Sequence, residues 1–229
     1  QEMIIGNRGI VANGVGKIRT NGLRNGKMNY KVELLENKKL ADPFILEIHY
    51  AKRKPSISYL FGMYDNKELI GVISYGSPPN PNLCYGIAGV KNKSKVIELN
   101  RLVLKYNRKN EASYLVGQSL KLLPKPKLVV SYADTSQNHL GVVYQATNFI
   151  YTGLSAKRKE WKIIGSDKHS KTVTELYDLQ TRKNNPDKFA LVDRPRKHRY
   201  LYILANKTDK KQLLKELNYP IMEYPKWSK

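Results

Sequence analysis

The apolar residues of this chain fall into runs and spacings that predict strands and helices. Residues 58–64 and 69–75 are apolar runs separated by four polar residues, which predicts a β-hairpin. The runs 96–104 and 128–132 predict two further strands. Three prolines predict a loop over 76–82, because proline lacks the backbone donor that a strand or helix needs.

Other segments place apolar residues at helical spacing. Residues 111–123 show this pattern and Pro124 ends it, and residues 138–147 carry a second apolar face. Beyond residue 151 the pattern predicts strands at 172–179 and 199–204 and a short amphipathic helix at 210–217.

From residue 58 the predicted order is β-β-β-α-β-α-β, an antiparallel meander that turns into a parallel crossover. This order predicts an α/β (α+β) fold with a mixed sheet and flanking helices, and it is similar to the core of the GCN5-related N-acetyltransferases. We expect a flexible basic N-terminal arm over 1–30, where glycines are scattered among basic residues. A catalytic core over 31–155 and a basic C-terminal extension packed on it over 156–229 would follow.

Charge adds a partner to this picture. The chain has 41 basic and 19 acidic residues, a net charge of +22. An excess of this size repels itself on folding and is usually neutralised by a polyanion. Double-stranded DNA is the first partner to consider, followed by RNA and an anionic membrane surface. Codon bias explains why Lys outnumbers Arg, but it does not explain why basic residues outnumber acidic ones.

Several classes of protein are disfavoured. No apolar run approaches 18 residues, which argues against a membrane span, and no secretory signal stands at the start. The single cysteine, Cys84, excludes an internal disulfide and any multi-cysteine zinc site, so a cytoplasmic location is expected. Nothing in the sequence indicates an obligate protein partner. The run 14–18 lacks the spacing of a phosphate-binding loop, and Pro78 and Pro79 lack the neighbours of an adenine-methyltransferase loop.

Polar residues near the ends of predicted strands and the starts of predicted helices form a distributed constellation. Groups at such positions converge on one crevice of an open α/β sheet, and Arg101, Ser113 and Asp134 could all reach it. Each also has a structural explanation: Asp134 as a helix cap, Arg101 as an ion-pair partner and Tyr144 as a core residue.

The ordered set of such residues from 49 to 153 resembles the Mom family of phage DNA-modification proteins. It consists of His49 and Tyr50, Gly71 and Val72, 75–78, 98–102, Asn110 and Ser113, 131–134, His139 and Gly141, 144–146, Asn148 and Phe149, and Tyr151 and Gly153. The resemblance implies a transferase of acetyltransferase-like fold that attaches a carbamoylmethyl group to the exocyclic amine of adenine in double-stranded DNA. The modification would protect phage DNA from host restriction enzymes, so the site of action would be the cytoplasm of the host bacterium.

The resemblance also implies cofactors and roles. Iron would be held by His49, Tyr50 and Asp134, and an acyl-coenzyme A such as acetyl-CoA would lie near Arg101, Tyr144 and either Ser113 or Ser119. Tyr144, Asp134 and Arg101 would be the catalytic residues. The usual acetyltransferase pyrophosphate loop is missing before the helix at 111, although Arg108, Lys109 and the helix N-terminus offer an anion site.

A basic run in the predicted extension is the candidate DNA contact. It contains Arg194, Arg196, Lys197 and Arg199 within six residues, before the predicted strand. We predict that this run, with the N-terminal arm, contacts phosphates beside a flipped adenine. Two other functions stay open: an acetyltransferase-fold enzyme that acts on a protein or a small amine, and a DNA-binding protein without catalytic activity.

Overall fold

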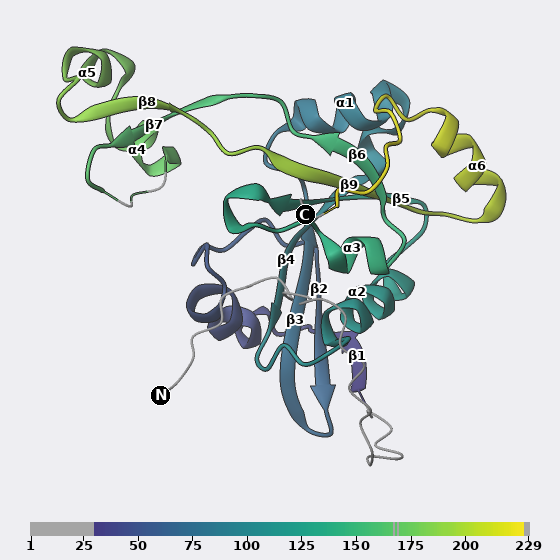
Figure 1. Ribbon diagram of the computed structural model, residues 1–229. Coiled ribbons are helices and arrows are strands. Elements are labelled where there is room, and N and C mark those ends of the chain that lie inside the picture. The colour runs from purple at the N-terminus through teal and green to yellow at the C-terminus, as the bar shows by residue number, and fades with distance from the viewer. Residues whose placement is uncertain (1–29, 167, 169, 227–229) are drawn as a thin grey trace.

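The protein is built around one seven-stranded sheet, seen in a computed structural model that describes residues 30–166, 168 and 170–226. The strands in sheet order are β1 (Tyr30–Leu34), β2 (Tyr59–Asp65), β3 (Glu68–Gly76), β4 (Val96–Leu104), β5 (Lys127–Asp134), β9 (Lys197–Leu204) and β6 (Ile150–Leu154). Only β4 and β5 run parallel. This mostly antiparallel sheet with flanking helices confirms the predicted mixed α/β fold (Figure 1).

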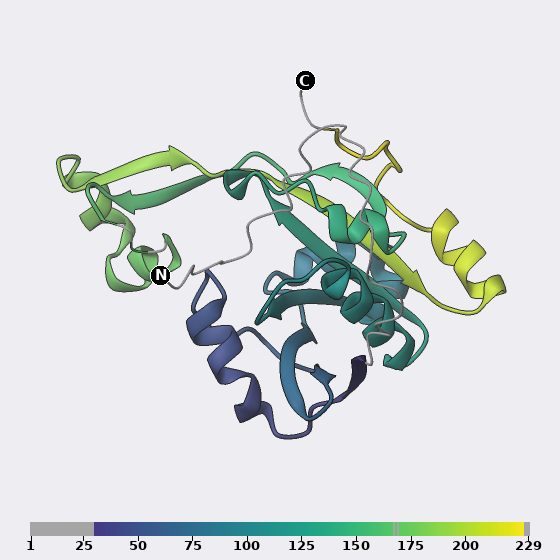
Figure 2. The ribbon, with the colours of Figure 1, turned by 60° about the horizontal axis from the view of Figure 1, so that its bottom comes forward.

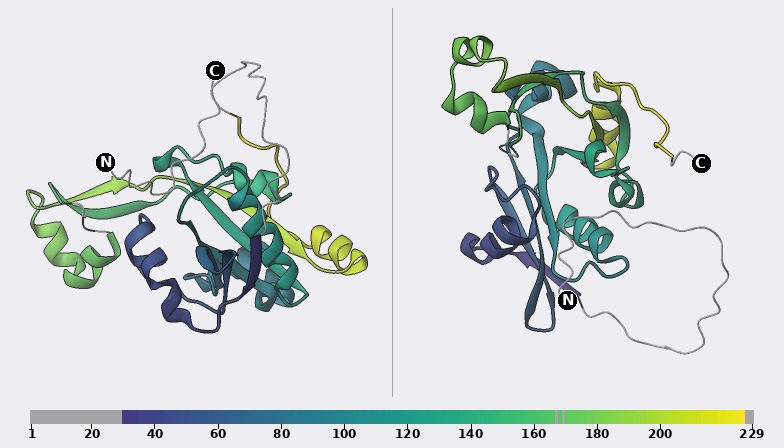
Figure 3. Two further views of the ribbon diagram at one scale, coloured as in Figure 1. Left: turned by 90° about the horizontal axis from the view of Figure 1, so that it is seen from below. Right: turned by 60° about the vertical axis from the view of Figure 1, so that its left-hand side comes forward.

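Helices cover both faces of the sheet. One face carries α2 (Glu111–Leu122) and α3 (Val142–Ala146), and it buries Leu115 and Val116 completely. On the other face, the π-helix η2 (Pro43–Ile48) packs over β2, β3 and β4, with the 3-10 turn η1 (Lys38–Ala41) before it. Helices α1 (Pro81–Asn92) and α6 (Lys207–Lys215) cover the β4, β5 and β9 part of that face. The views in Figures 2 and 3 show these two layers from other sides.

The sheet opens between its two parallel strands. Pairing of β4 with β5 is limited to Val96–Glu98 against 128–130, after which β4 stays with β3 and β5 stays with β9. Beyond the last pair, the Ser131 hydroxyl donates a hydrogen bond to the Leu99 carbonyl at 3.1 Å. The two strands therefore diverge toward their carboxyl ends, where functional groups gather in open α/β sheets.

A β-ribbon leaves the sheet and carries two helices at its far end. Strands β7 (Lys159–Ile163) and β8 (Phe189–Asp193) pair with each other, and α4 (Ser170–Leu176) and α5 (Leu179–Asn184) lie between them in the chain. Val173 and Phe189 are buried within this unit, which Figure 2 shows projecting from the sheet. We call residues 156–196 the arm.

Two sequence predictions about the region after 151 are wrong. The predicted strand 172–179 is helix α4 and the start of α5, because Val173 and Tyr177 pack on the ribbon at helical spacing and Asp178 caps α5. The predicted core of 31–155 also does not contain the whole sheet, because β9 comes from beyond residue 155 and lies between β5 and β6. The predicted strand 199–204 is correct and starts two residues earlier.

Three further boundaries differ from the prediction. Part of the predicted loop 76–82 belongs to α1, because Pro81 takes the first helical position after the Asn80 cap. The helix predicted over 138–147 shrinks to α3, since Asn138 and Gly141 adopt positive φ angles of 53° and 72°. Two 3-10 turns, η3 (Lys93–Lys95) and η4 (Thr135–Gln137), complete the fold.

The helix predicted over 210–217 is α6, which begins at Lys207. The N-terminal arm predicted over 1–30 lies outside the described residues except for Tyr30, which begins β1. Within the described part of the chain, no helix combines the length and the apolarity needed to cross a membrane.

Candidate active site

A cavity of about 770 Å³ lies where β4 and β5 separate. Its walls come from the carboxyl-terminal half of β4, the end of β5, the start of α2, the loop into α3, residues 79–83 and the base of the arm. At one wall Gly141 packs directly against Tyr200, so closely that a Cβ atom at this position would collide with the Tyr200 ring. A cavity of this size is large enough for a ligand of several rings or for two reactants.

Most of the predicted site residues line this one cavity. They are His49, Tyr50, Arg101, Arg108, Ser113, Asp134, Tyr144, Arg194, Lys197 and Arg199. Three predicted residues do not line it: Lys109, Ser119 and Arg196. Ser119 is fully buried on the face of α2 that packs on the sheet, where its hydroxyl shares a 2.7 Å hydrogen bond with the Tyr75 hydroxyl. Of the two candidate serines, only Ser113 therefore faces the cavity.

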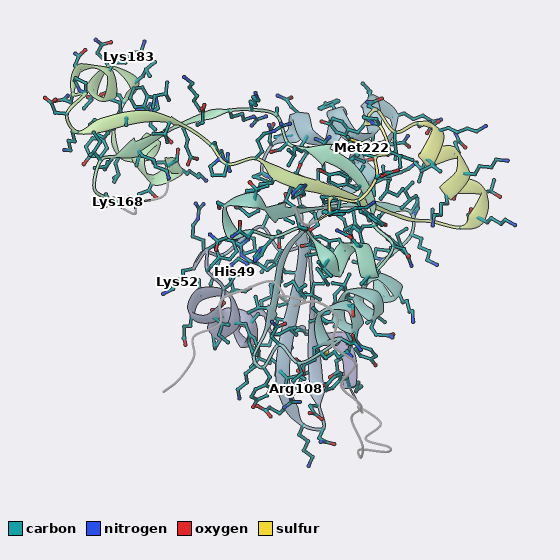
Figure 4. All side chains as sticks on the ribbon, in the orientation of Figure 1. His49, Lys52, Arg108, Lys168, Lys183 and Met222 are labelled. Atoms are coloured by element: carbon teal, nitrogen blue, oxygen red, sulfur yellow. The ribbon has the colours of Figure 1, made fainter. Side chains whose placement is uncertain are left out.

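His49 is held as a neutral imidazole at the cavity wall. It follows η2, and its Nδ1 accepts a hydrogen bond from the Ala51 amide at 3.1 Å. Burial, helped by the positive charges of Arg101 and Lys197, lowers the pKa of His49 to about 4. The ring of His49, which Figure 4 labels, stacks on the half-exposed ring of its neighbour Tyr50, with 4.5 Å between the centroids.

Asp134 is a carboxylate whose oxygens are already occupied. One oxygen accepts from the Ser136 amide and hydroxyl at the start of η4, and the other lies 2.8 Å from the Lys197 ammonium. Burial alone would raise the pKa of Asp134, but the hydrogen bonds from Lys197 and Ser136 outweigh it and keep the pKa below its usual value. The helix-cap explanation and the ion pair therefore both apply to this residue.

The three expected iron ligands line the same cavity. They are His49, Tyr50 and Asp134, and a neutral His and a carboxylate suit iron. Lys197 forms an ion pair with Asp134, and the charges of Arg101 and Lys197 act on His49. Among the described residues, no three His, Cys, Asp or Glu side chains form a metal-binding group, so iron here would need Tyr50 as its third ligand. Lys197 would have to release Asp134 before that carboxylate could bind iron.

Arg101 is fixed on β4 by backbone carbonyls. Its Nη1 donates to the Asn100 carbonyl at 2.6 Å and its Nη2 to the Arg53 carbonyl at 2.9 Å. Its buried Nε has no hydrogen-bond partner in the described part of the protein. An unsatisfied buried donor is costly, so a hydrogen-bond acceptor that reached this N–H would stabilise the protein.

Glu98 is a cavity residue that the sequence reasoning did not assign a role. It is the last β4 residue paired with β5, and burial raises its pKa to about 7, although the charges of Lys197 and Arg101 oppose this rise. A carboxyl of this pKa can accept a proton near neutral pH. The available signal was the one acidic residue of β4, preceded by two apolar residues and followed by Leu99.

Tyr144 is both a core residue and part of the cavity wall. Its ring packs against Phe149 and Tyr200 at 5.3 Å between centroids. Burial raises the pKa of Tyr144 to about 12, although a hydrogen bond with Ser131 opposes this rise. The phenol therefore keeps its proton at neutral pH and can act as a hydrogen-bond donor.

The start of α2 differs from the anion site that was predicted there. The fully buried carboxylate of Glu111 accepts the Arg108 amide at 2.6 Å and the Tyr30 hydroxyl at 2.8 Å. The Arg108 guanidinium pairs with Asp65 at 3.1 Å. Part of the positive end of this helix is thus neutralised by its own acid, and Ala112 and Ser113 are the first-turn residues that line the cavity.

Only the first part of the predicted basic run at 194–199 is an exposed loop. Lys197 already belongs to β9 and pairs with Asp134, while the Arg196 Nε donates to the Ser155 carbonyl at 2.6 Å. Arg199 is only 7% exposed, donates to Thr152 and lies 3.4 Å from the centre of the Tyr219 ring. Of this run, Arg194 alone remains an exposed side chain, 3.6 Å from Glu160.

The cavity as a whole is strongly cationic. Its lining includes six basic residues, Arg101, Arg108, Arg158, Arg194, Lys197 and Arg199, against the two acidic residues Glu98 and Asp134. A lining of this kind attracts anionic ligands such as phosphate groups.

The chain matches one family model, and several solved structures resemble it at low sequence identity. The model of the Mom protein family matches residues 29–226. The methylcarbamoylase Mom of Escherichia phage Mu is 30% identical over 197 residues, which covers 82% of this chain and 80% of that protein. An N-acetyltransferase from Staphylococcus aureus Mu50 gives a TM-score of 0.43 at 14% identity, covering 77% of this chain and 99% of the other. A Bacillus subtilis acetyltransferase crystallised with CoA gives 0.40 at 13%, covering 76% and 99%.

Proposed function

The chain belongs to the Mom protein family, and from this premise we propose that it modifies adenine in double-stranded DNA. The product would carry a carbamoylmethyl-type group on the exocyclic amine and would protect the DNA of a phage from restriction in the host cytoplasm. Simple transfer of an acetyl unit does not make this group, because it needs a carbon–nitrogen alkyl bond and a terminal amide, so the reaction also needs a nitrogen donor and an oxidant. Sequence similarity to the phage Mu methylcarbamoylase carries this proposal.

The cavity supports a reaction between a flipped base and a second molecule. Adenine must leave the base stack to expose its amine to an enzyme, which costs a few kcal/mol. The cavity offers both the space and the cationic lining that a nucleotide with its flanking phosphates requires. Aromatic residues in the lining, Tyr50, Tyr132 and Tyr219, provide surfaces for stacking.

Three residues of the cavity have chemistry that suits amine modification. The amine loses a proton when its nitrogen forms a new bond. Glu98 lines the cavity and would take that proton, because a carboxyl with a pKa of about 7 can accept a proton near neutral pH. Tyr144 would donate a hydrogen bond to the incoming group, and the free Nε–H of Arg101 would orient it. His49 stays neutral and can accept or donate a hydrogen bond without adding charge.

We further propose that the donor side of the cavity is the start of α2. Ala112 and Ser113 line it there, and a coenzyme A thioester such as acetyl-CoA would place its phosphates near this helix end. The Glu111 carboxylate competes for part of the same positive end, so the contact would differ from that of a free helix N-terminus. An iron ion at His49, Tyr50 and Asp134 would supply redox or Lewis-acid chemistry once Lys197 had released Asp134.

The direct test is the nucleoside composition of DNA exposed to this protein. Plasmid DNA from cells that express the protein is digested to nucleosides and analysed by mass spectrometry. We expect an adenosine of increased mass, absent from DNA of cells that express the Arg101→Ala variant. If adenosine stays unmodified while the protein binds duplex DNA, the chain is a DNA-binding protein without this activity. If it neither binds nor modifies DNA, an amine other than adenine is its substrate.

A further inference from the structure

The arm is a continuation of the sheet that shares a wall with the cavity. Strands β6 and β9 are antiparallel neighbours, and the same two chain segments go on as β7 and β8. The Ser155 amide donates to the Lys197 carbonyl and the Arg194 amide to the Arg158 carbonyl, both at 2.8 Å, so the ribbon stays paired across the junction. Arg158 and Arg194 line the cavity. A ligand at the cavity mouth would therefore meet the arm.

The far part of the arm has its own packing contacts. Tyr177 packs on Phe189 with 4.9 Å between ring centroids, and the Arg182 guanidinium lies 5.3 Å from the centre of the Trp161 ring. Figures 1 and 3 show the arm projecting beyond the sheet on the side where η2 lies. Figure 4 places His49 and Lys52 on that side, beneath the arm.

Unpaired positive charge is concentrated at the base of the arm. Residues 156–196 contain 11 basic and six acidic residues. Several of the acids have assigned partners: Glu160 lies within 4.0 Å of Lys162 and Arg194, and Asp178 caps α5. Lys157, Arg158 and Lys159 are consecutive and exposed, and none of the three forms an ion pair with a described residue. Free surface cations beside a cationic cavity are the usual footprint of a phosphate backbone.

A second exposed basic segment stands on the other side of the mouth. Lys52, Arg53 and Lys54 lie two to four residues after Tyr50, and the Arg53 carbonyl accepts a hydrogen bond from Arg101 of the cavity. Lys54 pairs with Asp42, whereas Lys52 and Arg53 form no ion pair with a described residue. Cations on both sides of the mouth would let one anionic polymer cross it.

We propose that the arm holds the DNA duplex across the cavity mouth, with Lys157, Arg158 and Lys159 contacting phosphates next to the reacting base. This inference rests on the proposed DNA substrate. It assigns the phosphate contacts to Lys157, Arg158 and Lys159 and not to the run 194–199. Phosphate contacts position a duplex without reading its sequence, so this surface accounts for affinity and register and not for sequence preference. A ribbon with its own core is already ordered before DNA arrives, which lowers the entropic cost of binding.

The test compares two triple variants that remove equal charge. Lys157→Ala/Arg158→Ala/Lys159→Ala changes the arm, and the matched control Lys207→Ala/Lys211→Ala/Lys215→Ala changes one exposed face of α6. Affinity for a duplex of random sequence is measured by fluorescence anisotropy at several salt concentrations. We expect the arm variant to reduce the slope of log K against log salt by about 2–3, because each lost phosphate contact removes about 0.9. The α6 control should keep the wild-type slope.

Several outcomes would overturn the assignment. Equal slopes for the arm variant and the wild type, or an equal loss in the α6 control, would show that the arm does not hold the duplex. A second variant replaces residues 157–194 with Asn-Gly, a two-residue turn that can close a hairpin. If this variant keeps the wild-type melting temperature of the core and still binds DNA as tightly, the inference fails. Loss of self-association in place of DNA affinity would assign the arm to a protein interface.

The same experiments separate this inference from the proposed function. Modified adenosine with unchanged DNA affinity in the arm variants would leave the proposed function standing and reject the role of the arm. Absence of modified adenosine and of duplex binding in the wild type would reject both.

Discussion

At the scale of single residues, the carboxyl of Glu98 owes its chemical properties to its position in the fold. Glu98 lies where the two parallel strands part, and its pKa of about 7 follows first from burial. Arg101 and Lys197 keep that pKa from rising further, so the three residues form one electrostatic unit. Removing the charge of Arg101 or Lys197 should therefore raise the pKa of Glu98 further.

The first prediction is that Glu98→Gln lowers the rate of DNA modification about 10²–10⁴-fold, the usual contribution of a general base. The wild-type rate should fall as the pH drops below about 7, because the protonated carboxyl cannot accept a proton. The remaining activity of the variant should show no such step. A pH profile of product formation with saturating DNA checks this, and a Gln variant with full activity would remove Glu98 from the mechanism.

Glu98 also makes a prediction about stability. Its folded-state pKa of about 7 lies above the usual value of a carboxyl, so the folded state favours the protonated form. This contribution is complete at acid pH and is lost as the pH rises toward and through 7. The wild type should therefore lose roughly 3 kcal/mol relative to Glu98→Gln between about pH 4.5 and pH 8. Urea unfolding of both proteins at a series of pH values measures the difference, and parallel curves would contradict the shifted pKa.

The third prediction concerns Lys197 and iron. While Lys197 holds Asp134 at 2.8 Å, iron has to compete with an ammonium group for that carboxylate. Lys197→Met should therefore tighten iron binding, and Asp134→Asn should weaken it. Anaerobic titration of the metal-free protein with Fe(II), followed by absorbance or calorimetry, provides the readout without any need for activity. Equal affinities in all three proteins would place iron elsewhere or exclude these ligands.

At the scale of elements, α2 carries two serines with different tasks. Ser113 lies in its first turns and faces the cavity, whereas Ser119 lies two turns later and bonds with the Tyr75 hydroxyl on β3. The helix thus joins the site to the buried core, and a serine-to-alanine change should have opposite consequences at the two positions.

Ser119→Ala should lower the free energy of unfolding by about 1–3 kcal/mol, because the buried Tyr75 hydroxyl loses its partner. Its product yield should stay near that of the wild type at a temperature where the protein is folded. Ser113→Ala should leave stability unchanged, since its hydroxyl bonds only the Asn110 carbonyl, and should weaken donor binding. Urea unfolding and product assays on the two variants decide the matter, and a reversed pattern would return the role to Ser119.

At the scale of the whole molecule, the charge of +22 is unevenly used. Part of it is neutralised inside the protein, as at Arg108 with Asp65 and at Lys197 with Asp134. The exposed remainder near the cavity mouth is concentrated in 52–54 and 157–159 and at Arg194. This distribution would suit a duplex that lies over the mouth, as proposed above.

The fifth prediction is that duplex affinity falls steeply with salt. With about six phosphates neutralised at the mouth, log K against log salt should have a slope of about −5. A duplex should also raise the melting temperature of the protein, because it neutralises a surface that repels itself and binds only the folded state. Anisotropy titrations and thermal melts with and without DNA test both statements. A slope near zero would favour the small-amine alternative.

The sequence alone determined the elements whose signal is local. Apolar runs and a polar turn specify the hairpin β2 and β3, and helical spacing with a terminal proline specifies α2, because these patterns depend only on neighbouring residues. Family resemblance also indicated His49, Arg101, Asp134 and Tyr144, and the structure brings all four to one cavity.

The tertiary structure decided what depends on distant partners. Strand β9 enters the sheet between β5 and β6, so the second half of the basic run is the start of a strand and Arg199 is buried. The segment 172–179 is helical because its apolar side chains pack on the ribbon β7 and β8, which outweighs the strand preference of Thr and Val. Burial in the folded protein raises the pKa of Glu98, and Asp134 pairs with a lysine that lies about 60 residues away in the chain. Electrostatic energy depends on distance in space, so no pattern along the sequence could supply it.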